Sequence, residues 1–529
     1  MKTALRTVSP QAVKAMLGDG EELALVDVRE QGVYFHEHLL FASCIPLSHL
    51  ELRVADLIPR RSARVVLCDG TDDGMARLAA ERLSEYGYAD VAVMSGGVAA
   101  WRDAGYEVFS GVNVVSKAFG EYIEHRYDTP RITAQELAAK QEAHENMVIL
   151  DSRPMNEFHN ISIPGGIDCP GAELVYRVFN TAPDPETLVV VNCAGRTRSI
   201  IGAQSLINAG IHHRVVALKD GTMGWQLAGF TPAKGETAHA APPDGDALAQ
   251  AQVAAARVAE RFGVTHIDHA RLEQLHDESR QRTLYVLDVR TPEEFAKGHL
   301  PGSRHAAGGQ LVQATDEYVA TRHSRIVLVD NDGVRTTMTA SWLKQMGWDD
   351  VYVLKDALRT SLESGPGVPT LCGFRRATTI SASRLNDRIA GGDIAVLDFA
   401  SSLEYRNQHV PGAFWGVRSR IEQALSALAS GKTLVLTSPD GVLAHYVAND
   451  LSKRKPAVDA LVLDGGTAAW IAAGYSTGSG SEHFTTEAND IWYKPYEQAS
   501  AVREAMQGYL DWEVNLVKQI ERDGDARFR

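Results

Sequence analysis

The sequence predicts an α/β chain of four tandem domains, each a parallel sheet flanked by helices. Three observations carry this prediction. Short runs of β-branched residues recur along the chain, helical patterns that end at or near Gly separate them, and the spacing between them repeats four times. Buried strands that alternate with helices are typical of parallel sheets with right-handed crossovers. Each repeat, at about 100–125 residues, is long enough to bury a core of its own.

The repeat is defined by three anchor positions. The first apolar run of each copy ends at an aspartate: Asp27, Asp151, Asp288 and Asp398. A second apolar run ends 42 residues later in three copies and 40 later in the fourth, at Asp69, Cys193, Asp330 and Ser438. The third anchor follows 32 residues further on, at Trp101, Trp225, Leu362 and Trp470. Matching gaps in four copies predict four versions of one domain.

Segments between and after the repeats complete the predicted organisation. A Pro- and Gly-rich stretch after residue 231 runs into an Ala-rich helical pattern, and its composition predicts a hinge between two pairs of domains. The predicted boundaries are 1–110, 111–235, 263–370 and 371–480 for the domains, 236–262 for the linker and its helix, and 481–529 for a C-terminal tail.

Composition excludes several classes of protein. The 529 residues are 44% hydrophobic and 23% charged, as in ordinary globular proteins, and the net charge is −14. So acidic a chain is not expected to bind nucleic acid or an anionic membrane. Five cysteines predict free thiols in a reducing compartment. With no apolar signal segment or membrane span in the sequence, we expect a cytoplasmic protein; a homodimer is left open.

Several motifs resemble the rhodanese domain of sulfurtransferases. They are Asp-Val-Arg after a strand, Glu-Phe-x-x-Gly-His-Leu-Pro-Gly at 294–302, a cysteine loop at a strand end, and Gly-Gly-x-x-Ala-Trp near the end of two repeats. The resemblance covers nearly the whole chain as four rhodanese-like domains. It implies a compact α/β fold and a persulfide carried on Cys193. Asp69, Asp330 and Ser438 occupy that position elsewhere, so domains 1, 3 and 4 are expected to be inactive copies.

The residues after Cys193 support a reactive thiol. Small Ala194 and Gly195 allow a tight backbone curl whose N–H groups can bind an anion, and Thr197 and Ser199 belong to the same segment. Arg196 and Arg198 add fixed positive charge, and a helix is expected to begin beside them. We therefore predict that residues 194–199 bind the substrate and that they lower the pKa of the Cys193 thiol.

The predicted reaction is sulfur transfer in two displacements. Thiosulfate or a similar small anionic donor passes its outer sulfur to Cys193, and a thiol or cyanide acceptor removes it. No cofactor is expected, and no metal, because no cluster has the spacing of a zinc site. Two alternatives stay open: a persulfide carrier or regulatory scaffold that uses glutathione persulfide or 3-mercaptopyruvate, and a rhodanese-like phosphatase or arsenate reductase. The second is less favoured, because Ser199 stands where a C-x5-R loop has Arg.

Two further predictions concern the edge of the site. Arg153 opens a loop after a strand and is a weak candidate for the pocket mouth. The tail is too rich in aromatic residues for a disordered segment and should dock on the folded body. It is predicted either to cover an edge of domain 4 or to place Trp492, Tyr493 and Lys494 in the Cys193 pocket.

Overall fold

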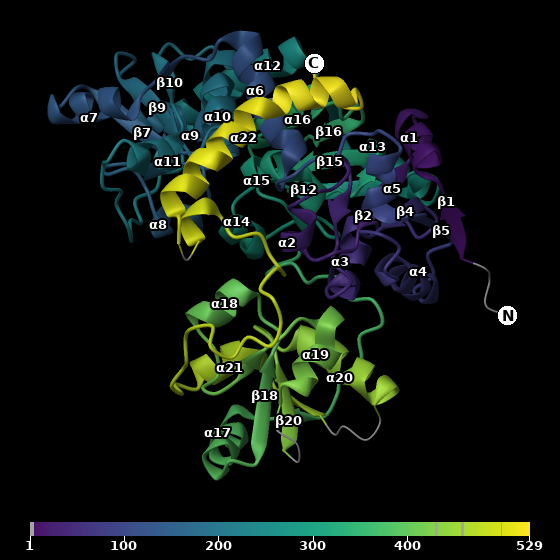
Figure 1. Ribbon diagram of the computed structural model, residues 1–529. Helices are drawn as coiled ribbons and strands as arrows, with labels where there is room; N and C mark the ends of the chain where they lie inside the picture. Colours follow the sequence, from purple (N-terminus) through teal and green to yellow (C-terminus); the bar gives the residue numbers. More distant parts are fainter. Residues whose placement is uncertain (1–4, 429–431, 456–459, 499) are drawn as a thin grey trace.

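The computed structural model describes residues 5–428, 432–455, 460–498 and 500–529. Four sheets of the same strand order confirm the predicted fold class of four parallel α/β domains (Figure 1). Within each domain the strands follow the order first, fifth, fourth, second and third, and all pairs are parallel. The central strand of each sheet, β4 (Arg64–Cys68), β9 (Leu188–Asn192), β15 (Arg325–Val329) or β20 (Thr433–Thr437), ends one residue before the anchor position 69, 193, 330 or 438.

Domains 1 and 2 occupy the first half of the chain. Domain 1 contains β1 (Arg6–Val8), α1 (Pro10–Gly18), β2 (Leu23–Asp27), α2 (Gln31–Tyr34), β3 (Ser43–Cys44), α3 (Leu50–Leu57), β4 (Arg64–Cys68), α4 (Met75–Glu85), β5 (Asp90–Met94) and α5 (Gly97–Asp103). A connecting helix, α6 (Val114–Tyr127), follows. Domain 2 contains β6 (Arg131–Ile132), α7 (Ala134–Glu142), β7 (Met147–Asp151), α8 (Met155–Asn160), β8 (Ile167–Asp168), η1 (Gly171–Glu173), α9 (Leu174–Thr181), β9 (Leu188–Asn192), α10 (Thr197–Asn208), β10 (Val215–Leu218) and α11 (Gly221–Leu227).

Domains 3 and 4 follow the linker helix α12 (Gly245–Phe262). Domain 3 contains β11 (Thr265–Ile267), α13 (His269–Asp277), η2 (Glu278–Arg280), β12 (Leu284–Asp288), α14 (Pro292–Lys297), β13 (Arg304–His305), α15 (Gly308–Gln313), η3 (Thr315–Glu317), β14 (Thr321–Arg322), β15 (Arg325–Val329), α16 (Val334–Gln345) and β16 (Val351–Leu354). Domain 4 contains β17 (Thr379–Ile380), α17 (Ala382–Gly391), β18 (Ile394–Asp398), α18 (Ser402–Asn407), β19 (Phe414–Trp415), η4 (Arg418–Arg420), α19 (Ile421–Ser426), β20 (Thr433–Thr437), α20 (Val442–Arg454), β21 (Ala460–Leu463) and α21 (Gly466–Ala472). The tail carries η5 (Pro495–Glu497) and α22 (Val502–Asp523).

The predicted hinge between two pairs of domains is wrong. Helix α12 buries an alanine face against domain 2 and against Val334 and Met338 of domain 3, in one continuous core. This face holds Ala247, Ala251, Ala254, Ala255 and Val258. Small side chains allow the helices to approach closely, so the Ala-rich segment fastens domains 2 and 3 together instead of separating them.

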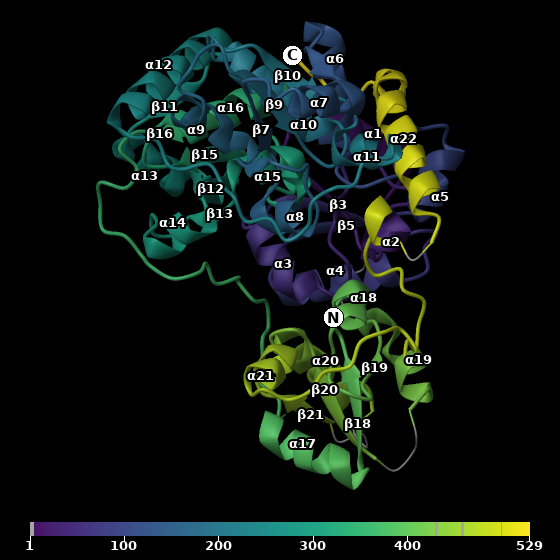
Figure 2. The ribbon, with the colours of Figure 1, turned by 90° about the vertical axis from the view of Figure 1, so that its left-hand side faces the viewer.

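Domains 1, 2 and 3 form one body, and domain 4 lies to one side of it (Figures 1 and 2). Domain 3 lends β14 to the sheet of domain 1, where Thr321 pairs antiparallel with Ala24 at the edge of β2. Domain 4 reaches domain 1 through Arg418, whose guanidinium binds the buried Glu51 carboxylate at 2.7 Å. The body thus brings domain 2, which carries Cys193, into contact with two domains that have an aspartate at the same position.

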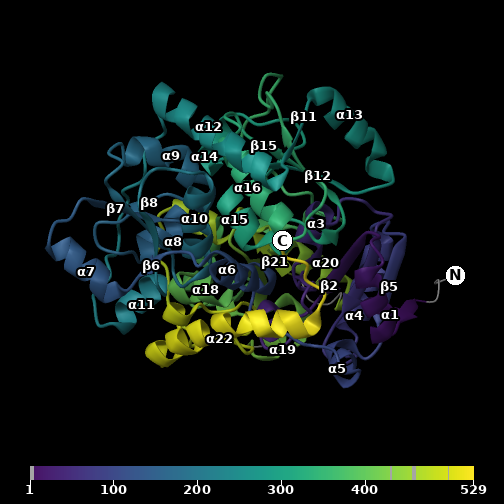
Figure 3. The ribbon, with the colours of Figure 1, turned by 90° about the horizontal axis from the view of Figure 1, so that it is seen from above.

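The tail returns from domain 4 to this body. It runs along domain 4 and past α2, and α22 then lies across α6 (Figures 2 and 3). Four apolar residues anchor α22, Met506, Leu510, Leu516 and Ile520, and each is buried. Burial of such side chains contributes roughly 1.5–3 kcal/mol each. The tail is therefore docked, as predicted, but mainly on the body of domains 1 and 2. No helix of the described residues is both long and apolar enough to cross a membrane.

Candidate functional site

Cys193 lies at the carboxyl end of the central strand of domain 2, the edge where parallel sheets bind ligands. All five residues of β9 are buried, and α10 begins four residues after the cysteine. The loop between them is held by α11, because the Thr222 amide donates to the Cys193 carbonyl and the Met223 amide to that of Ala194, both at 2.9 Å. Gly221 permits this approach: a Cβ there would lie 2.3 Å from the Cys193 carbonyl oxygen.

The thiol of Cys193 is 2% exposed, and its surroundings correct one prediction. Burial raises the pKa of the Cys193 thiol, whereas Arg198 and hydrogen bonding by Ser199 lower it. The thiol lies 3.6 Å from the Ser199 hydroxyl oxygen. The net shift of the thiol pKa is upward, so the predicted lowering is wrong. The reason is desolvation, which the composition of the loop does not reveal.

Arg198 is the loop arginine that faces the cysteine. Its guanidinium binds Glu157 of α8 through two nitrogens, at 2.8 and 3.2 Å, and contacts the Gln310 side chain of domain 3 at 3.3 Å. Burial opposes the ionisation of Glu157, but Arg198 and then Lys494 outweigh it and lower the pKa of that carboxyl to about 2. The charge of Arg198 is thus partly neutralised and held in a fixed position.

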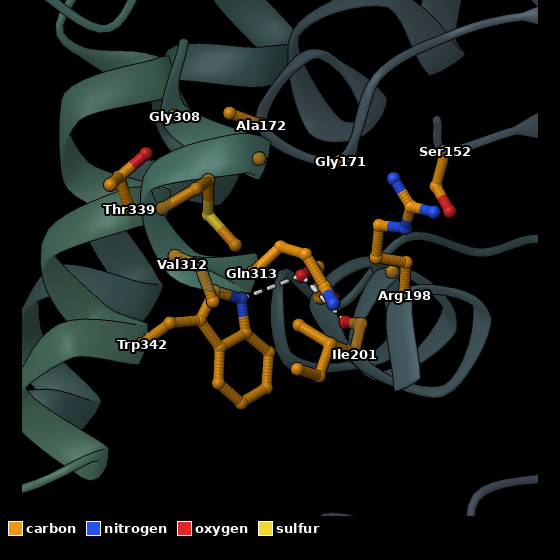
Figure 4. Close-up of a pocket in the computed structure, with 14 residues that line it drawn as sticks. Ser152, Gly171, Ala172, Arg198, Ile201, Gly308, Val312, Gln313, Thr339 and Trp342 are labelled. Carbon is orange, nitrogen blue, oxygen red and sulfur yellow. Dashed lines mark hydrogen bonds between the residues drawn. The ribbon is translucent and has the colours of Figure 1, made fainter. Parts of the chain in front are cut away.

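A water-sized cavity of about 30 Å³ lies behind Arg198, between domains 2 and 3 (Figure 4). Ile201 of α10 and Val312 and Trp342 of domain 3 line it, and the Trp342 indole N–H donates to the Ser205 hydroxyl at 2.8 Å. Arg198 therefore borders this interface, and domain 3 contacts its guanidinium through Gln310.

Arg196 does not face the cysteine. Its guanidinium binds Glu121 and Glu124 of α6 and Asp220 before α11, with the Glu121 bond at 2.6 Å and the Asp220 bond at 3.0 Å. The side chain is 6% exposed, and three carboxylates occupy its donors. The structure therefore corrects the prediction that this side chain binds the donor; it joins the loop to the connecting helix.

We expect Arg196→Ala to act mainly on stability. Glu121 is buried, and an unpaired buried carboxylate costs about 3–5 kcal/mol. The free energy of unfolding, measured in denaturant, should fall by that amount, and kcat should fall more than KM rises. The double variant Arg196→Ala/Glu121→Gln should recover part of the stability. A raised KM for thiosulfate with unchanged stability would show instead that Arg196 binds the sulfur donor.

A cavity of about 240 Å³ opens beside the cysteine loop. Ala194 and Arg198 form its wall on the side of domain 2, and α6, domain 3 and the tail form the others. Lining residues from outside domain 2 are Gln31, Val112, Asn113, Lys117, Gln310, Gln313, Ala314, Glu317, Trp492, Lys494, Pro495, Tyr496 and Tyr509. The site is thus composite, and domains 1 and 3, which lack the cysteine at the anchor position, supply part of it.

Of the three tail residues predicted to lie in the pocket, two line the cavity and one does not. Trp492 and Lys494 line the cavity, and the Lys494 ammonium lies 3.6 Å from the Glu157 carboxylate. Tyr493 turns away to domain 4, where its hydroxyl donates to Ser402 at 2.7 Å. Its predicted place in the pocket is therefore wrong. The tail thus contacts domain 4 and also lines the cavity beside the cysteine loop, so both predicted locations apply to different parts of it.

Arg153 is also excluded from the cavity wall. Its guanidinium is fully buried and binds the Asp151 carboxylate at 2.7 and 2.8 Å. Domains 1 and 3 repeat this pair as Asp27–Arg29 and Asp288–Arg290. A pair that recurs in domains without the cysteine fixes the backbone after the strand that ends at Asp151, so the prediction of a place at the pocket mouth is wrong.

Two charged residues near the site were missed by sequence reasoning. Lys117 of α6 donates to the Val112 carbonyl at 2.7 Å and lies 5.1 Å from the ring centres of Trp492, Tyr509 and Trp512. Glu513 of α22 accepts from the Thr197 hydroxyl at 3.0 Å. Both lie outside any motif.

In domains 1, 3 and 4 the anchor position is filled by polar side chains. Asp69 accepts from the Asp72 and Ala76 amides at 2.9 and 3.1 Å, and Asp330 accepts from the Gly333 and Thr336 amides at 2.8 and 2.9 Å. These carboxylates occupy the loop N–H groups that would otherwise receive an anion. In domain 4 the Ser438 hydroxyl accepts from Ala444 at 3.3 Å.

The other cysteines lie outside this site. Cys68 and Cys169 are fully buried in hydrophobic cores, Cys372 is buried, and Cys44 is half-buried. Burial raises the pKa of the Cys68 and Cys169 thiols well above the ordinary value. They are therefore poor nucleophiles.

Comparison with known proteins assigns the chain to a family. The rhodanese-like domain model matches residues 9–104, 133–228, 268–359 and 381–473, which together exceed half of the chain. The chain belongs to the rhodanese-like family, and the predicted resemblance is confirmed.

Individual relatives extend the comparison. A crystal structure of a thiosulfate sulfurtransferase from Pseudomonas aeruginosa is 46% identical, with 99% of each chain covered and a TM-score of 0.93. The thiosulfate sulfurtransferase GlpE of Pseudomonas paraeruginosa is 31% identical over 14% of this chain and 66% of its own length. An HTH-type transcriptional regulator of Mycobacterium tuberculosis is 33% identical over 19% of this chain and 42% of its own. The chain thus spans less than two thirds of the length of these two curated relatives.

Proposed function

We propose that this protein is a rhodanese-type sulfurtransferase that carries sulfane sulfur as a persulfide on Cys193, with thiosulfate as the donor. The observation that carries the proposal is the anchor position. Of four homologous strand ends, one has a thiol facing an arginine beside a cavity, and the others have side chains that cannot carry sulfur. The near full-length likeness to a thiosulfate sulfurtransferase supports the same enzyme class.

The first half-reaction moves sulfur onto the enzyme. The Cys193 thiolate attacks the outer sulfur of thiosulfate, a bond forms between the two sulfurs, and the bond to the sulfite sulfur breaks. The bonding electron pair leaves with sulfite as SO₃²⁻, and the enzyme keeps the persulfide Cys193–S–S⁻. Charge moves from the cysteine to the leaving group, where Arg198 can stabilise it.

The second half-reaction regenerates the thiolate. A cyanide ion or a thiolate attacks the outer sulfur of the persulfide and departs as thiocyanate or as a new persulfide. The electron pair of the broken bond returns to Cys193. Because Cys193 is 2% exposed, we expect side chains of the cavity wall to move when each reactant enters. A thiol acceptor, a cytoplasmic location and the absence of nucleic-acid partners stay predictions of the sequence.

Lys117 is proposed to bind the anionic donor. Arg198 and Lys494 both lie near Glu157, whereas Lys117 forms no ion pair within the described part of the chain. It faces the same cavity as Ala194, and three aromatic rings hold its ammonium. Burial lowers the pKa of Lys117, and the charge of Glu513 raises it without forming an ion pair with it, so the Lys117 ammonium can still attract a dianion.

The proposal is tested by turnover with thiosulfate and cyanide, measured beside hydrolysis of an aryl phosphate. Thiocyanate should form catalytically, and the phosphate ester should stay intact, because the loop lacks the sixth-position arginine of a C-x5-R phosphatase. Phosphate release without thiocyanate would reject the sulfurtransferase assignment.

The pH dependence of kcat/KM follows from two opposed groups. Burial lowers the pKa of Lys117 to about 8, and burial raises the pKa of the Cys193 thiol above its ordinary value. Thiolate increases with pH, while the ammonium is lost as pH rises through about 8. We expect kcat/KM for thiosulfate to rise up to about pH 8, level off and then fall. In Lys117→Met the rise should continue past pH 8 from a lower value; a bell shape kept in this variant would exclude Lys117 as the falling group.

A further inference from the structure

The four anchor loops differ in how they are held. In domains 1 and 3 a carboxylate at the anchor position accepts from the first amides of the following helix and so holds the loop from inside. Domain 2 has Cys193 in place of that carboxylate. Its loop amides are left for sulfur and for the donor anion, so the loop needs support from elsewhere.

That support comes from two helices outside domain 2. Arg196 is fastened to Glu121 of α6, and the Thr197 hydroxyl donates to Glu513 Oε1 of α22 at 3.0 Å. The Tyr509 hydroxyl donates to the same oxygen at 3.1 Å. Figure 3 shows α22 lying along α6. In domain 2 the carboxylate that holds the loop therefore comes from α22, far along the chain, and not from the anchor position.

The contact of α22 with the loop is close and buried. A Cβ at Gly195 would lie 3.1 Å from Glu513 Oε2 and 3.3 Å from a Tyr509 ring carbon, and one at Gly120 would lie 2.9 Å from the Thr197 methyl group. Glu513 is 1% exposed, and its Oε2 has no hydrogen-bond partner among the described residues. A buried, half-satisfied carboxylate is costly, which argues for a purpose beyond packing.

We propose that Glu513 is a positioning residue of the catalytic loop and that the C-terminal helix α22 belongs to the active centre. Through Thr197 it holds the loop in place, as Asp69 and Asp330 hold the loops of domains 1 and 3. The amides of the domain 2 loop thereby stay directed at the Cys193 sulfur. Its negative charge also opposes ionisation of the thiol. The proposal deepens the proposed function, on which it rests.

The test compares four variants with the wild-type full-length protein: Glu513→Ala, Glu513→Gln, Thr197→Val and the double variant Glu513→Ala/Thr197→Val. Glu521→Ala is the matched control, because Glu521 is an exposed glutamate of the same helix. Each is assayed for kcat and KM with thiosulfate, for thermal stability, and for the rate of Cys193 alkylation by iodoacetamide against pH.

Glu513→Ala and Thr197→Val should each lower kcat by about 10–100-fold with little change in KM, since a displaced loop misaligns the reacting sulfur. The double variant should lose no more kcat than Glu513→Ala alone, because each single substitution already removes the contact between Thr197 and Glu513. Glu513→Gln keeps an acceptor oxygen and should stay within about threefold of wild type in kcat. It should also alkylate faster at pH 7, because a negative charge near the thiol is gone.

Several results would overturn the proposal: additive losses, a Gln variant as impaired as the Ala variant, or an equal loss in Glu521→Ala. A fall in activity that follows only the folded fraction would do the same. Failure of wild type to use thiosulfate would reject the proposed function and not this inference, because the alkylation rates need no donor. Non-additive alkylation effects of Glu513→Ala and Thr197→Val would still support the contact, and additive ones would reject it.

Discussion

Cys193→Ser should lower sulfur transfer from thiosulfate to cyanide by about 1,000-fold or more, because a serine hydroxyl with no base beside it cannot form the persulfide. The fold should be unaffected, since the two side chains differ by one atom at a position that contacts Ser199. Thiocyanate formation in the purified full-length variant measures the effect, and circular dichroism checks the fold.

Matched controls come from the other thiols. Cys68→Ser and Cys169→Ser change residues that lie in hydrophobic cores, and Cys372→Ser changes one near domain 1. Each should keep most of the kcat per folded molecule, with some loss of stability where a buried position becomes polar. Substantial activity in Cys193→Ser, or its loss in one of the controls at full folding, would contradict a single sulfur-carrying site.

Arg198→Ala should have the second largest effect, a loss of about 100–1,000-fold in kcat/KM for thiosulfate. It removes the positive charge that faces both Cys193 and the leaving sulfite. It also leaves the partly buried Glu157 carboxylate with only Lys494 as a charged partner, which lowers the stability of the fold. Steady-state kinetics and denaturant unfolding of the same preparation separate the two effects.

The double variant Arg198→Met/Glu157→Gln distinguishes stabilisation of the leaving sulfite by the Arg198 charge from an effect of Arg198 on the stability of the fold. It removes both partners of the buried pair, so the free energy of unfolding should return toward that of the wild type. Its kcat/KM should stay low, since no cation remains at the position of Arg198. Recovery of activity together with stability would show that Arg198 acts on the fold and not on the sulfur transfer.

The sequence predicted the fold and the anchor residues well because both depend on local pattern. Spacing between Asp151, Cys193 and Trp225 reflects strand and helix lengths that every copy must keep, whatever its function. Cys193 stood out because the same position in three copies carries another residue. Such differences between copies of one domain are readable without a structure.

Other features depend on contacts between distant segments, which spacing does not show. Arg196 and Arg198 are alike in sequence, yet only Arg198 faces the cysteine, because α6 brings Glu121 and Glu124 to Arg196. The thiol pKa was mispredicted for a similar reason: α22, far along the chain, helps to bury the loop. The composition of the linker suggested a hinge, but the alanine face of α12 packs in a core shared by domains 2 and 3.

The central claim is that sulfur is carried on Cys193 alone, and peptide mass spectrometry after treatment with thiosulfate tests it most directly. The account predicts an added mass of about 32 Da on the peptide that contains Cys193, removed by cyanide. Peptides that contain Cys44, Cys68, Cys169 or Cys372 should keep their unmodified mass. Cyanide-labile sulfur on one of those cysteines, with Cys193 unmodified, would contradict the account.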